Sequence, residues 1–256
     1  KTAAMYTDLS LMTADPSIGK DASEFFKNMS IGNISGSYDQ LIVAPAGLKQ
    51  KVLYLMDEEI KKGTNGRIIM KMNSLTDVDF IRKVSEASMA GVKIDLIVRG
   101  ICCLLPGIAG YTDNVRVTSI VGRYLEHARI FSFGTGAGQK IYIGSADMMT
   151  RNTEKRVEVA APVFDERIKN QINHYLRIML GDNVKARVLL SNGKTRKKEQ
   201  KEPVIDSQAA FMEEAVHARQ EMPAQDKNLL KRFKSLQNVK GIKELRSRLR
   251  KHTDRS

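Results

Sequence analysis

Between residues 38 and 190 the chain alternates short apolar runs with longer segments that are apolar on one side only. In residues 48–62 and 77–90 the apolar positions recur at helical spacing, which predicts two amphipathic helices. The runs at 41–45, 67–72 and 92–98 are short and apolar throughout, which is typical of buried strands. A strand, helix, strand, helix, strand order with short connections predicts parallel pairing in an α/β domain.

The second half of this region predicts a mixed sheet rather than a continued parallel one. Two short strands flank the glycine-rich segment 134–138 and are expected to form a hairpin. No helix is predicted to begin at that segment, so it does not match the dinucleotide-binding motif. A helix is predicted over 165–180, and further strands over 115–121, 128–133, 140–143, 156–160 and 184–190. The predicted fold class is therefore α/β, a mixed sheet flanked by helices.

The two ends of the chain differ from this central domain. Residues 1–37 contain a weakly alternating run, a predicted helix over 18–29 and a glycine- and serine-rich linker, which together read as an incomplete unit. The first residues lack an initiator Met and resemble mid-domain sequence, so we expect the chain to be part of a longer protein. We predict a central domain over 38–191 and, from 192 to 256, a basic tail that is largely helical or partly disordered.

Charge and composition narrow the classes of function. The net charge is +13, and residues 194–256, with 17 basic and 9 acidic residues, carry more than half of it. Polyanion binding by the central domain must therefore depend on individually placed arginines. No run approaches the roughly 18 apolar residues of a membrane span. The two cysteines are adjacent, which provides neither a disulfide framework nor a set of zinc ligands.

The most informative stretch is 121–159, where one histidine, His127, lies among several arginines. Imidazole can act as a nucleophile or transfer a proton near neutral pH. A guanidinium group can donate two parallel hydrogen bonds to the oxygens of one phosphate. Glu126 could orient the imidazole, and the turn at 144–147 is expected to offer free backbone N–H groups. The neighbouring arginines are Arg123, Arg129, Arg151 and Arg156. An anionic substrate, most simply a phosphate, fits this composition.

Arg99 is a second candidate, because it follows the strand predicted at 92–98 and strand ends hold ligand groups in α/β proteins. Gly100 after it would allow a ligand to approach the backbone closely. Each candidate also has a plain structural interpretation. His127 could be a surface histidine and Arg99 a charge closing a strand, while Asp147, Arg151 and Asn152 could form a helix cap. Tyr6, in an alternating run, could be a core residue.

Several long motifs, in order, resemble one family. They are NSL (73–75), DLIVRGICCL (95–104), SIVGRYLEH (119–127), YIGSAD (142–147), RVEV (156–159) after Arg151 and Asn152, and TAAMYTDLSLMTAD (2–15). Together they resemble the C-terminal part of bacterial polyphosphate kinases, over about residues 1–215. The resemblance implies phospholipase-D-like catalytic domains, with 1–37 as the end of the first and 38–191 as the second.

The resemblance also implies a chemistry. ATP would donate its γ-phosphoryl group to a histidine, which passes it reversibly to inorganic polyphosphate. Tyr6, Arg99 and His127 would bind ATP, and His127 would be catalytic through proton transfer or phosphate contact. Supporting roles would fall to Arg123, Asp147, Arg151, Asn152, Arg156 and Glu158. The phosphorylated histidine and the Mg²⁺ ligands would lie upstream, so the chain holds no metal site and is expected to be inactive alone.

In the same way, the resemblance implies a cytoplasmic homo-oligomer that binds ATP or ADP and polyphosphate, with peripheral membrane association left open. Nucleic-acid binding by the tail is not expected. Two alternatives stay open. One is a phospholipase-D-type phosphodiesterase with His127 as nucleophile, although Arg129 stands where that superfamily has lysine. The other is a non-enzymatic polyanion-binding module that depends on the tail. The kinase hypothesis requires Arg99 and His127 to converge on one pocket.

Overall fold

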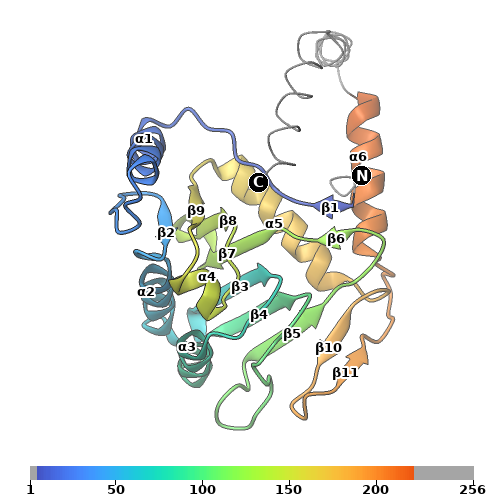
Figure 1. Cartoon of the computed structure of the whole chain (residues 1–256). Helices are drawn as coiled ribbons and strands as arrows, with labels where there is room; N and C mark the ends of the chain where they lie inside the picture. The colour runs from blue at the N-terminus through green and yellow to red at the C-terminus, as the bar shows by residue number, and fades with distance from the viewer. Residues whose placement is uncertain (1–4, 222–256) are drawn as a thin grey trace, which may run out of the picture. The chain divides into compact units, whose positions relative to one another are not determined.

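The computed structural model describes residues 5–221. The chain divides into two compact units, residues 1–208 and 209–256, and the first contains the sheet shown in Figure 1. Its nine described strands are ordered β11-β10-β5-β4-β3-β7-β8-β9-β2. They are β2 (Ile42–Ala44), β3 (Arg67–Met72), β4 (Lys93–Val98), β5 (Val115–Ser119), β7 (Arg129–Phe133), β8 (Lys140–Gly144), β9 (Glu158–Val163), β10 (Arg187–Leu189) and β11 (Thr195–Lys197).

Two further strands form a small separate sheet, and the helices are distributed along the whole described chain. The small sheet pairs β1 (Tyr6–Thr7) with β6 (Leu125–Glu126). The helices are α1 (Pro16–Ser30), α2 (Leu48–Ile60), α3 (Val78–Met89), α4 (Thr150–Glu154), α5 (Glu166–Gly181) and α6 (Ser207–Glu221), with short 3₁₀ turns η2 (Gly63–Asn65) and η3 (Gly136–Gly138). The predicted α/β class with a mixed sheet is confirmed.

The centre of the sheet is parallel and its other pairings are antiparallel. Strands β3, β4 and β5 pair in parallel, with Ile68 opposite Ile94 and Ile94 opposite Val115. Strands β7 and β8 form the predicted antiparallel hairpin. The parallel pairing expected for the first predicted strand is wrong. Strand β2 lies at the sheet edge and pairs antiparallel with β9, because β7, β8 and β9 separate it from β3.

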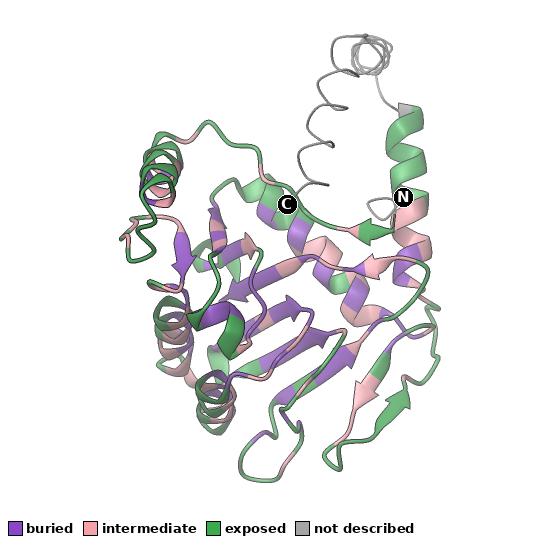
Figure 2. Cartoon of the chain, viewed as in Figure 1, coloured by how far each residue is buried: buried purple, intermediate pink, exposed green. Residues whose placement is uncertain are grey.

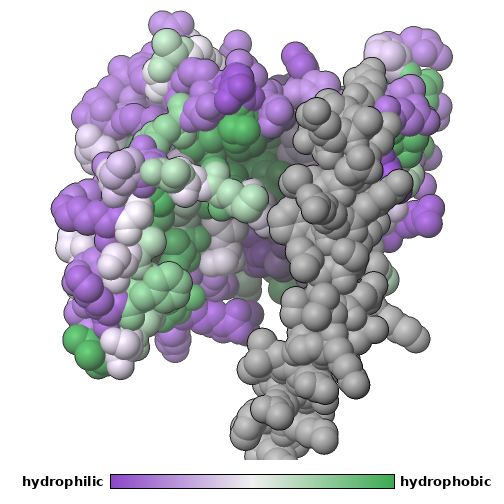
Figure 3. All heavy atoms as spheres, turned by 90° about the horizontal axis from the view of Figure 1, so that it is seen from above, coloured by the Kyte–Doolittle hydropathy of each residue, from purple (hydrophilic) through white to green (hydrophobic). Residues whose placement is uncertain are grey.

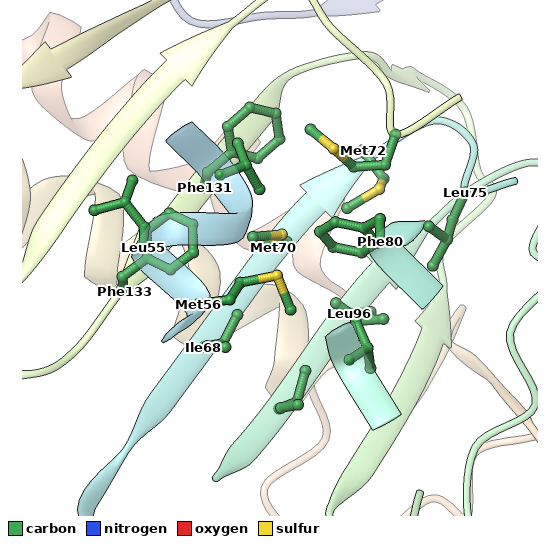
Figure 4. Close-up of a cluster of buried hydrophobic side chains, with 14 of the residues drawn as sticks. Leu55, Met56, Ile68, Met70, Met72, Leu75, Phe80, Leu96, Phe131 and Phe133 are labelled. Carbon is green, nitrogen blue, oxygen red and sulfur yellow. The ribbon is translucent and has the colours of Figure 1, made fainter. Parts of the chain in front are cut away.

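The hydrophobic core lies between one face of the sheet and the helices α2 and α3. Strand residues that alternate along β3 and β4 point into it, as period-two alternation requires. Helix α3 begins at Asp77, whose carboxylate accepts a hydrogen bond from the Phe80 N–H (3.0 Å), and Phe80 itself is fully buried. Figure 4 shows Met70 and Leu96 from the strands close to Phe80 from the helix. The sheet and the two helices therefore share one closed apolar layer.

The opposite face of the sheet carries α5 and is more polar. Lys71 of β3 lies 5.9 Å from the ring of Tyr175 in α5, and Gln139 joins Ser132 of β7 to Asn173 of α5 through hydrogen bonds of 2.8 and 2.9 Å. Figure 2 shows that the central strands are nevertheless largely buried, while the outward sides of the helices are exposed. The sheet thus separates an apolar layer from a partly polar one.

The end of the first unit differs from the prediction at one element. The charge run at 194–201 contains strand β11, which pairs with β10 and extends the sheet, although its three residues are exposed. Further along, the buried Asp182 accepts hydrogen bonds from the Ser207 N–H and hydroxyl (2.8 and 2.6 Å), which fixes the first residue of α6. Among residues 5–221, no helix is both long and apolar enough to cross a membrane.

Candidate active site

The candidate residues gather at one edge of the sheet because of strand direction. Asn73 and Arg99 directly follow the parallel strands β3 and β4, and Asp147 follows β8, which runs in the same sense. Strand β7 is antiparallel to β3, so His127, two residues before it, lies at the same edge. Figure 3 views this end of the molecule, where hydrophilic side chains surround several hydrophobic ones outside the grey region. Strand ends thus collect the polar residues.

The small sheet brings the N-terminal segment to His127. Strand β1 pairs in parallel with β6, placing Tyr6 opposite Leu125 and Thr7 opposite Glu126. Continued by one residue, this register places Asp8 beside His127. The rings of Tyr6 and His127 are in edge-to-face contact, with centroids 4.8 Å apart, and Tyr6 is 43% exposed. Tyr6 is therefore a solvent-accessible partner of the histidine and not the core residue that an alternating run could suggest.

His127 is held between a carboxylate and a guanidinium. Its Nδ1 lies 2.7 Å from Asp8 Oδ2, and Arg129 Nη1 lies 2.9 Å from its Nε2 and 3.1 Å from its Nδ1. Asp8 can only accept a hydrogen bond when ionised, and Arg129 can only donate one. For a neutral imidazole, the contact with Asp8 favours the tautomer with the proton on Nδ1 and the lone pair on Nε2. This arrangement orients a proton acceptor towards the cationic side of the site.

Arg99 is fixed by two acceptors from separate elements. Its Nε donates to the main-chain carbonyl of Glu126 (3.0 Å), and its Nη2 donates to Asn73 Oδ1 (2.9 Å). Among the described residues, its Nη1 has no hydrogen-bond partner. The reason for Gly100 differs from the expected ligand approach, because a Cβ there would lie 2.9 Å from the Asn73 carbonyl oxygen. The glycine instead allows the two strand ends to approach, which positions Arg99.

Asp147 joins the two basic residues into one network. Its Oδ1 accepts from the main-chain N–H of Asn73 (2.7 Å) and lies 3.4 Å from Arg129 Nε. Asn73 in turn holds Arg99, and Arg129 holds His127. Asp147 is 7% exposed, so it acts on its neighbours and not on solvent. Arg99 and His127 are thus connected at this edge through Asn73, Asp147 and Arg129. The single pocket expected to receive both side chains stays a prediction.

Glu126 does not orient His127, as the sequence had suggested, but belongs to a buried cluster behind it. Its carboxylate accepts from Gln208 Nε2 (2.7 Å) and the Tyr175 hydroxyl (3.2 Å), and it lies 3.4 Å from Lys71 Nζ. Burial lowers the pKa of Lys71 to about 8, although the neighbouring Glu126 opposes that shift. Burial, followed by the proximity of Glu126, raises the pKa of Tyr175. The cluster fixes the backbone from which His127 extends.

A second polar cluster surrounds Glu158 at the start of β9. Its carboxylate accepts from Asn152 Nδ2 (2.7 Å) and from the Ser145 hydroxyl. Asn152 is 2% exposed, and its Oδ1 is buried without a hydrogen-bond partner among the described residues. The expected free N–H groups of the 144–147 turn are not all available, because the Ser145 N–H donates to the Val159 carbonyl (2.9 Å). Glu158 is thus a held, nearly buried carboxylate at the same edge.

The structure does not bring every predicted arginine to His127. Of the four in the 121–159 stretch, only Arg129 contacts the imidazole in the described part of the chain. Arg123, Arg151 and Arg156 are exposed, and Arg123 lies over the ring of Tyr124 at 5.6 Å. The supporting role expected for these three arginines stays a prediction.

No metal cluster surrounds these residues in the described structure. Residues 5–221 contain no group of three or more histidine, cysteine, aspartate or glutamate side chains that could hold a metal ion. Neither Arg99 nor His127 lines any of four of the best-formed cavities, which have volumes of about 420 to 750 Å³, in this part of the chain. The candidate site therefore lies on the edge of the sheet outside these cavities.

Three important residues were not singled out from the sequence. Asp8 gave no recognisable signal, since an exposed aspartate near one end has an ordinary explanation. Lys71 was passed over as a single lysine within an apolar strand. Asn73 was noted as part of the NSL motif and not as a site residue. A lysine in an otherwise apolar strand of a parallel sheet was the one available hint, because such strands are buried on both faces.

Comparisons with known proteins identify one family over most of the chain. Residues 41–208 match the family model described as polyphosphate kinase C-terminal domain 2. A polyphosphate kinase of Staphylococcus saprophyticus is 46% identical over 225 residues, which are 87% of this chain and 31% of the relative. One of Exiguobacterium sibiricum is 50% identical over 189 residues, which are 73% of this chain and 26% of the relative.

Structural similarity extends to a solved member of the same group. The crystal structure of polyphosphate kinase from Porphyromonas gingivalis aligns with a TM-score of 0.76 and 36% identity, covering 82% of this chain and 33% of that one. The chain thus spans about a third or less of the length of these relatives. The family match covers well over half of the chain, from β2 to the first residues of α6. The chain therefore belongs to the polyphosphate kinase family and carries its C-terminal domain 2.

Proposed function

We propose that this chain supplies one side of the catalytic centre of a polyphosphate kinase. The complete enzyme would transfer the γ-phosphoryl group of ATP through a phosphohistidine to inorganic polyphosphate, and the reverse reaction would regenerate ATP. The observation that best supports this proposal is the hydrogen bond from Arg99 Nε to the Glu126 carbonyl (3.0 Å). It holds a permanent positive charge next to the backbone of His127.

The arrangement suits a triphosphate. Phosphoryl transfer develops charge on the equatorial oxygens of the transferred group, and fixed guanidiniums stabilise that charge. Arg99 would offer Nη1 to the phosphate chain, and Arg129 would turn from His127 Nε2 to a phosphate oxygen. Tyr6 presents an exposed ring beside His127, which fits contact with the nucleotide. The exposed Arg123, Arg151 and Arg156 would attract the anion to this edge.

His127 would manage a proton or contact a phosphate oxygen, while the attacking histidine would come from the preceding domain. Asp8 holds Nδ1, so Nε2 is the atom that accepts a proton and, once protonated, donates it. Glu158, already fixed by Asn152, could orient a further basic group from outside this chain. The Mg²⁺ ligands would likewise come from the preceding domain. The intact enzyme would be a cytoplasmic homo-oligomer.

Titration calorimetry with ATP on the 256-residue chain would test this function. We expect ATP to bind, and Arg99→Ala to weaken that binding at least tenfold, while Arg82→Ala leaves it unchanged. Arg82 is a suitable control because its side chain is 78% exposed and it lies on the outer surface of α3. We also expect no phosphohistidine after incubation with ATP and Mg²⁺. Equal ATP affinity in the two variants would refute the role of Arg99, and phosphohistidine formation would refute the need for an upstream histidine.

A further inference from the structure

A cavity of about 750 Å³ lies on the sheet face that carries α5, away from the candidate active site. Strands β3, β4, β5 and β10 and the second half of α5 line it, and Figure 1 shows α5 and β10 on either side of β5. Arg67, at the start of β3, lines the cavity, whereas Asn73 and Arg99 lie beyond the opposite ends of β3 and β4. None of Tyr6, Arg99 and His127 lines it. Its volume is within the range of small-molecule sites.

Positive charge dominates the lining of this cavity. Arg67, Arg116, Arg177 and Lys198 face a single carboxylate, that of Asp95, among the described residues that line it. Asp95 is buried and pairs with Arg67 and with Arg116 Nε (2.9 Å). One carboxylate cannot neutralise four cations, so the cavity keeps an excess of about three positive charges. A cavity of this kind favours an anionic ligand, because like charges in a concave site repel one another.

Arg116, Arg177 and Lys198 are each held by a neighbouring group, and each retains N–H groups that can donate a hydrogen bond to a ligand. Arg116 uses its Nε and Nη2 for Asp95, while its side chain is 78% exposed. Arg177 is exposed, and one of its Nη atoms lies 3.0 Å from His174 Nδ1. Lys198 donates to the Leu180 carbonyl. Burial lowers the pKa of its ammonium group, the charges of Asp182 and Asp95 oppose that shift, and the charge of Arg116 adds to it. An incoming anion would relieve that electrostatic cost.

The remaining lining is mostly aliphatic, with polar side chains at Thr118, Asn173 and Ser191. Ile69, Leu180, Val188 and Leu189 border the same cavity as the four cations. A bare inorganic polyphosphate has no group that gains from apolar contact. A ligand that combines phosphates with a flat organic body gains from both parts, since the body buries apolar surface while the phosphates meet the guanidiniums.

We propose that this cavity is a second anion site, specific for a nucleoside phosphate, with the phosphates on Arg116, Arg177 and Lys198 and the base against Leu180 and Val188. The inference does not depend on the role proposed for Arg99. It assigns a ligand-binding role to the sheet face opposite the main core. Occupancy of this site would follow the nucleotide concentration and would not depend on phosphoryl transfer at the sheet edge.

Two probes, ATP and inorganic tripolyphosphate, would test the proposal by calorimetry on the full chain. The variants are Arg99→Ala, the double variant Arg116→Ala/Arg177→Ala and the control Arg82→Ala. In the Arg99→Ala background we expect ATP binding to persist and to fall at least tenfold when the double change is added. Tripolyphosphate should bind this site at least fivefold more weakly than ATP.

The outcomes separate the cavity from the active site. If the double variant binds ATP as Arg82→Ala does, the second site is refuted, whatever Arg99→Ala does. If tripolyphosphate binds as tightly as ATP, the specificity for a nucleoside is refuted. Should the double variant fold poorly in thermal melting, Arg177→Glu tests the same point, because Arg177 is exposed on α5.

Photolabelling with 8-azido-ATP gives an independent measure. Label within 173–190 supports the site, and label only near Tyr6 contradicts it.

Discussion

Arg99 Nε donates a hydrogen bond of 3.0 Å to the carbonyl of Glu126, the residue immediately before His127. The contact is to backbone, so it positions the guanidinium relative to the histidine without engaging the imidazole. Asn73 provides the second acceptor and is itself held by Asp147 through its main-chain N–H. Three chain segments are therefore locked together before any ligand arrives, which is the preorganisation that electrostatic catalysis requires.

The first prediction concerns Asn73. We expect Asn73→Ala to weaken ATP binding roughly five- to tenfold, about 1–1.4 kcal/mol, because Arg99 loses an acceptor but keeps its charge. The main-chain bond from residue 73 to Asp147 is retained, so stability should change little. Calorimetry with ATP measures the effect, and Asn65→Ala, at an exposed turn position, is the matched control. Unchanged affinity in Asn73→Ala would show that Arg99 needs no such positioning.

The second prediction concerns the imidazole tautomer. Asp8 accepts from Nδ1, so we expect the ¹⁵N spectrum of neutral His127 to show a protonated Nδ1 and a bare Nε2. Asp8→Ala should shift the population towards the other tautomer, since the acceptor is lost. Asp39→Ala, which removes an exposed carboxylate that pairs with Lys20, should leave the spectrum unchanged. A spectrum that is the same in wild type and Asp8→Ala would contradict the assigned role of Asp8.

The third prediction is a pH dependence of stability caused by Lys71. Its pKa in the folded state is about 8, below the ordinary value of 10.5, because burial disfavours the ammonium form. Between these values the unfolded chain binds more protons, so raising the pH favours the folded state. From pH 8 to 10 this group should add roughly 2 kcal/mol to the free energy of unfolding.

Urea unfolding of wild type and Lys71→Met across this range measures that contribution. We expect the stability difference between the two proteins to change with pH in favour of wild type as the pH rises. Lys27→Met, at a position where the side chain is 72% exposed, should run parallel to wild type. Parallel curves for wild type and Lys71→Met would show that the lysine does not titrate as inferred.

The fourth prediction concerns Asp182. Its Oδ1 accepts three main-chain N–H groups, from residues 184, 185 and 186, at 2.8–3.0 Å, and its Oδ2 holds Ser207. Burial alone would raise the pKa of Asp182, but the hydrogen bonds from Ser207 and the backbone lower it. Asp182→Ala should therefore cost about 2–4 kcal/mol in the free energy of unfolding.

The same carboxylate has a defined acid sensitivity. Its stabilisation is fully present above pH 3.8 and is lost as the pH falls through its lower folded-state pKa. Acid unfolding followed by circular dichroism should show a smaller loss below pH 4 in Asp182→Ala than in wild type. Glu199→Ala, where the side chain is 73% exposed, is the control. A stability loss below 1 kcal/mol in Asp182→Ala would argue against the role of Asp182 in fixing the start of α6.

Periodicity in the sequence was sufficient to locate most elements. The helices at 48–62 and 77–90 and the strand at 67–72 agree with α2, α3 and β3 to within a few residues. Hydrophobic patterns report on contacts within one element, and these are local. The pairing of β2 was not predictable in this way, because its partner β9 lies more than 100 residues along the chain. The strand β11 was missed because its residues are polar and exposed.

By itself the sequence determined the α/β class, the positions of the elements, and which side chains could perform phosphate chemistry, through the motifs around Arg99 and His127. The tertiary structure alone decided which of them meet. Asp8 reaches His127 across 119 residues because β1 and β6 pair in one particular register, and Glu126 turns into the interior instead. The physical reason is that side-chain identity is local, whereas strand register and burial depend on the whole packed chain.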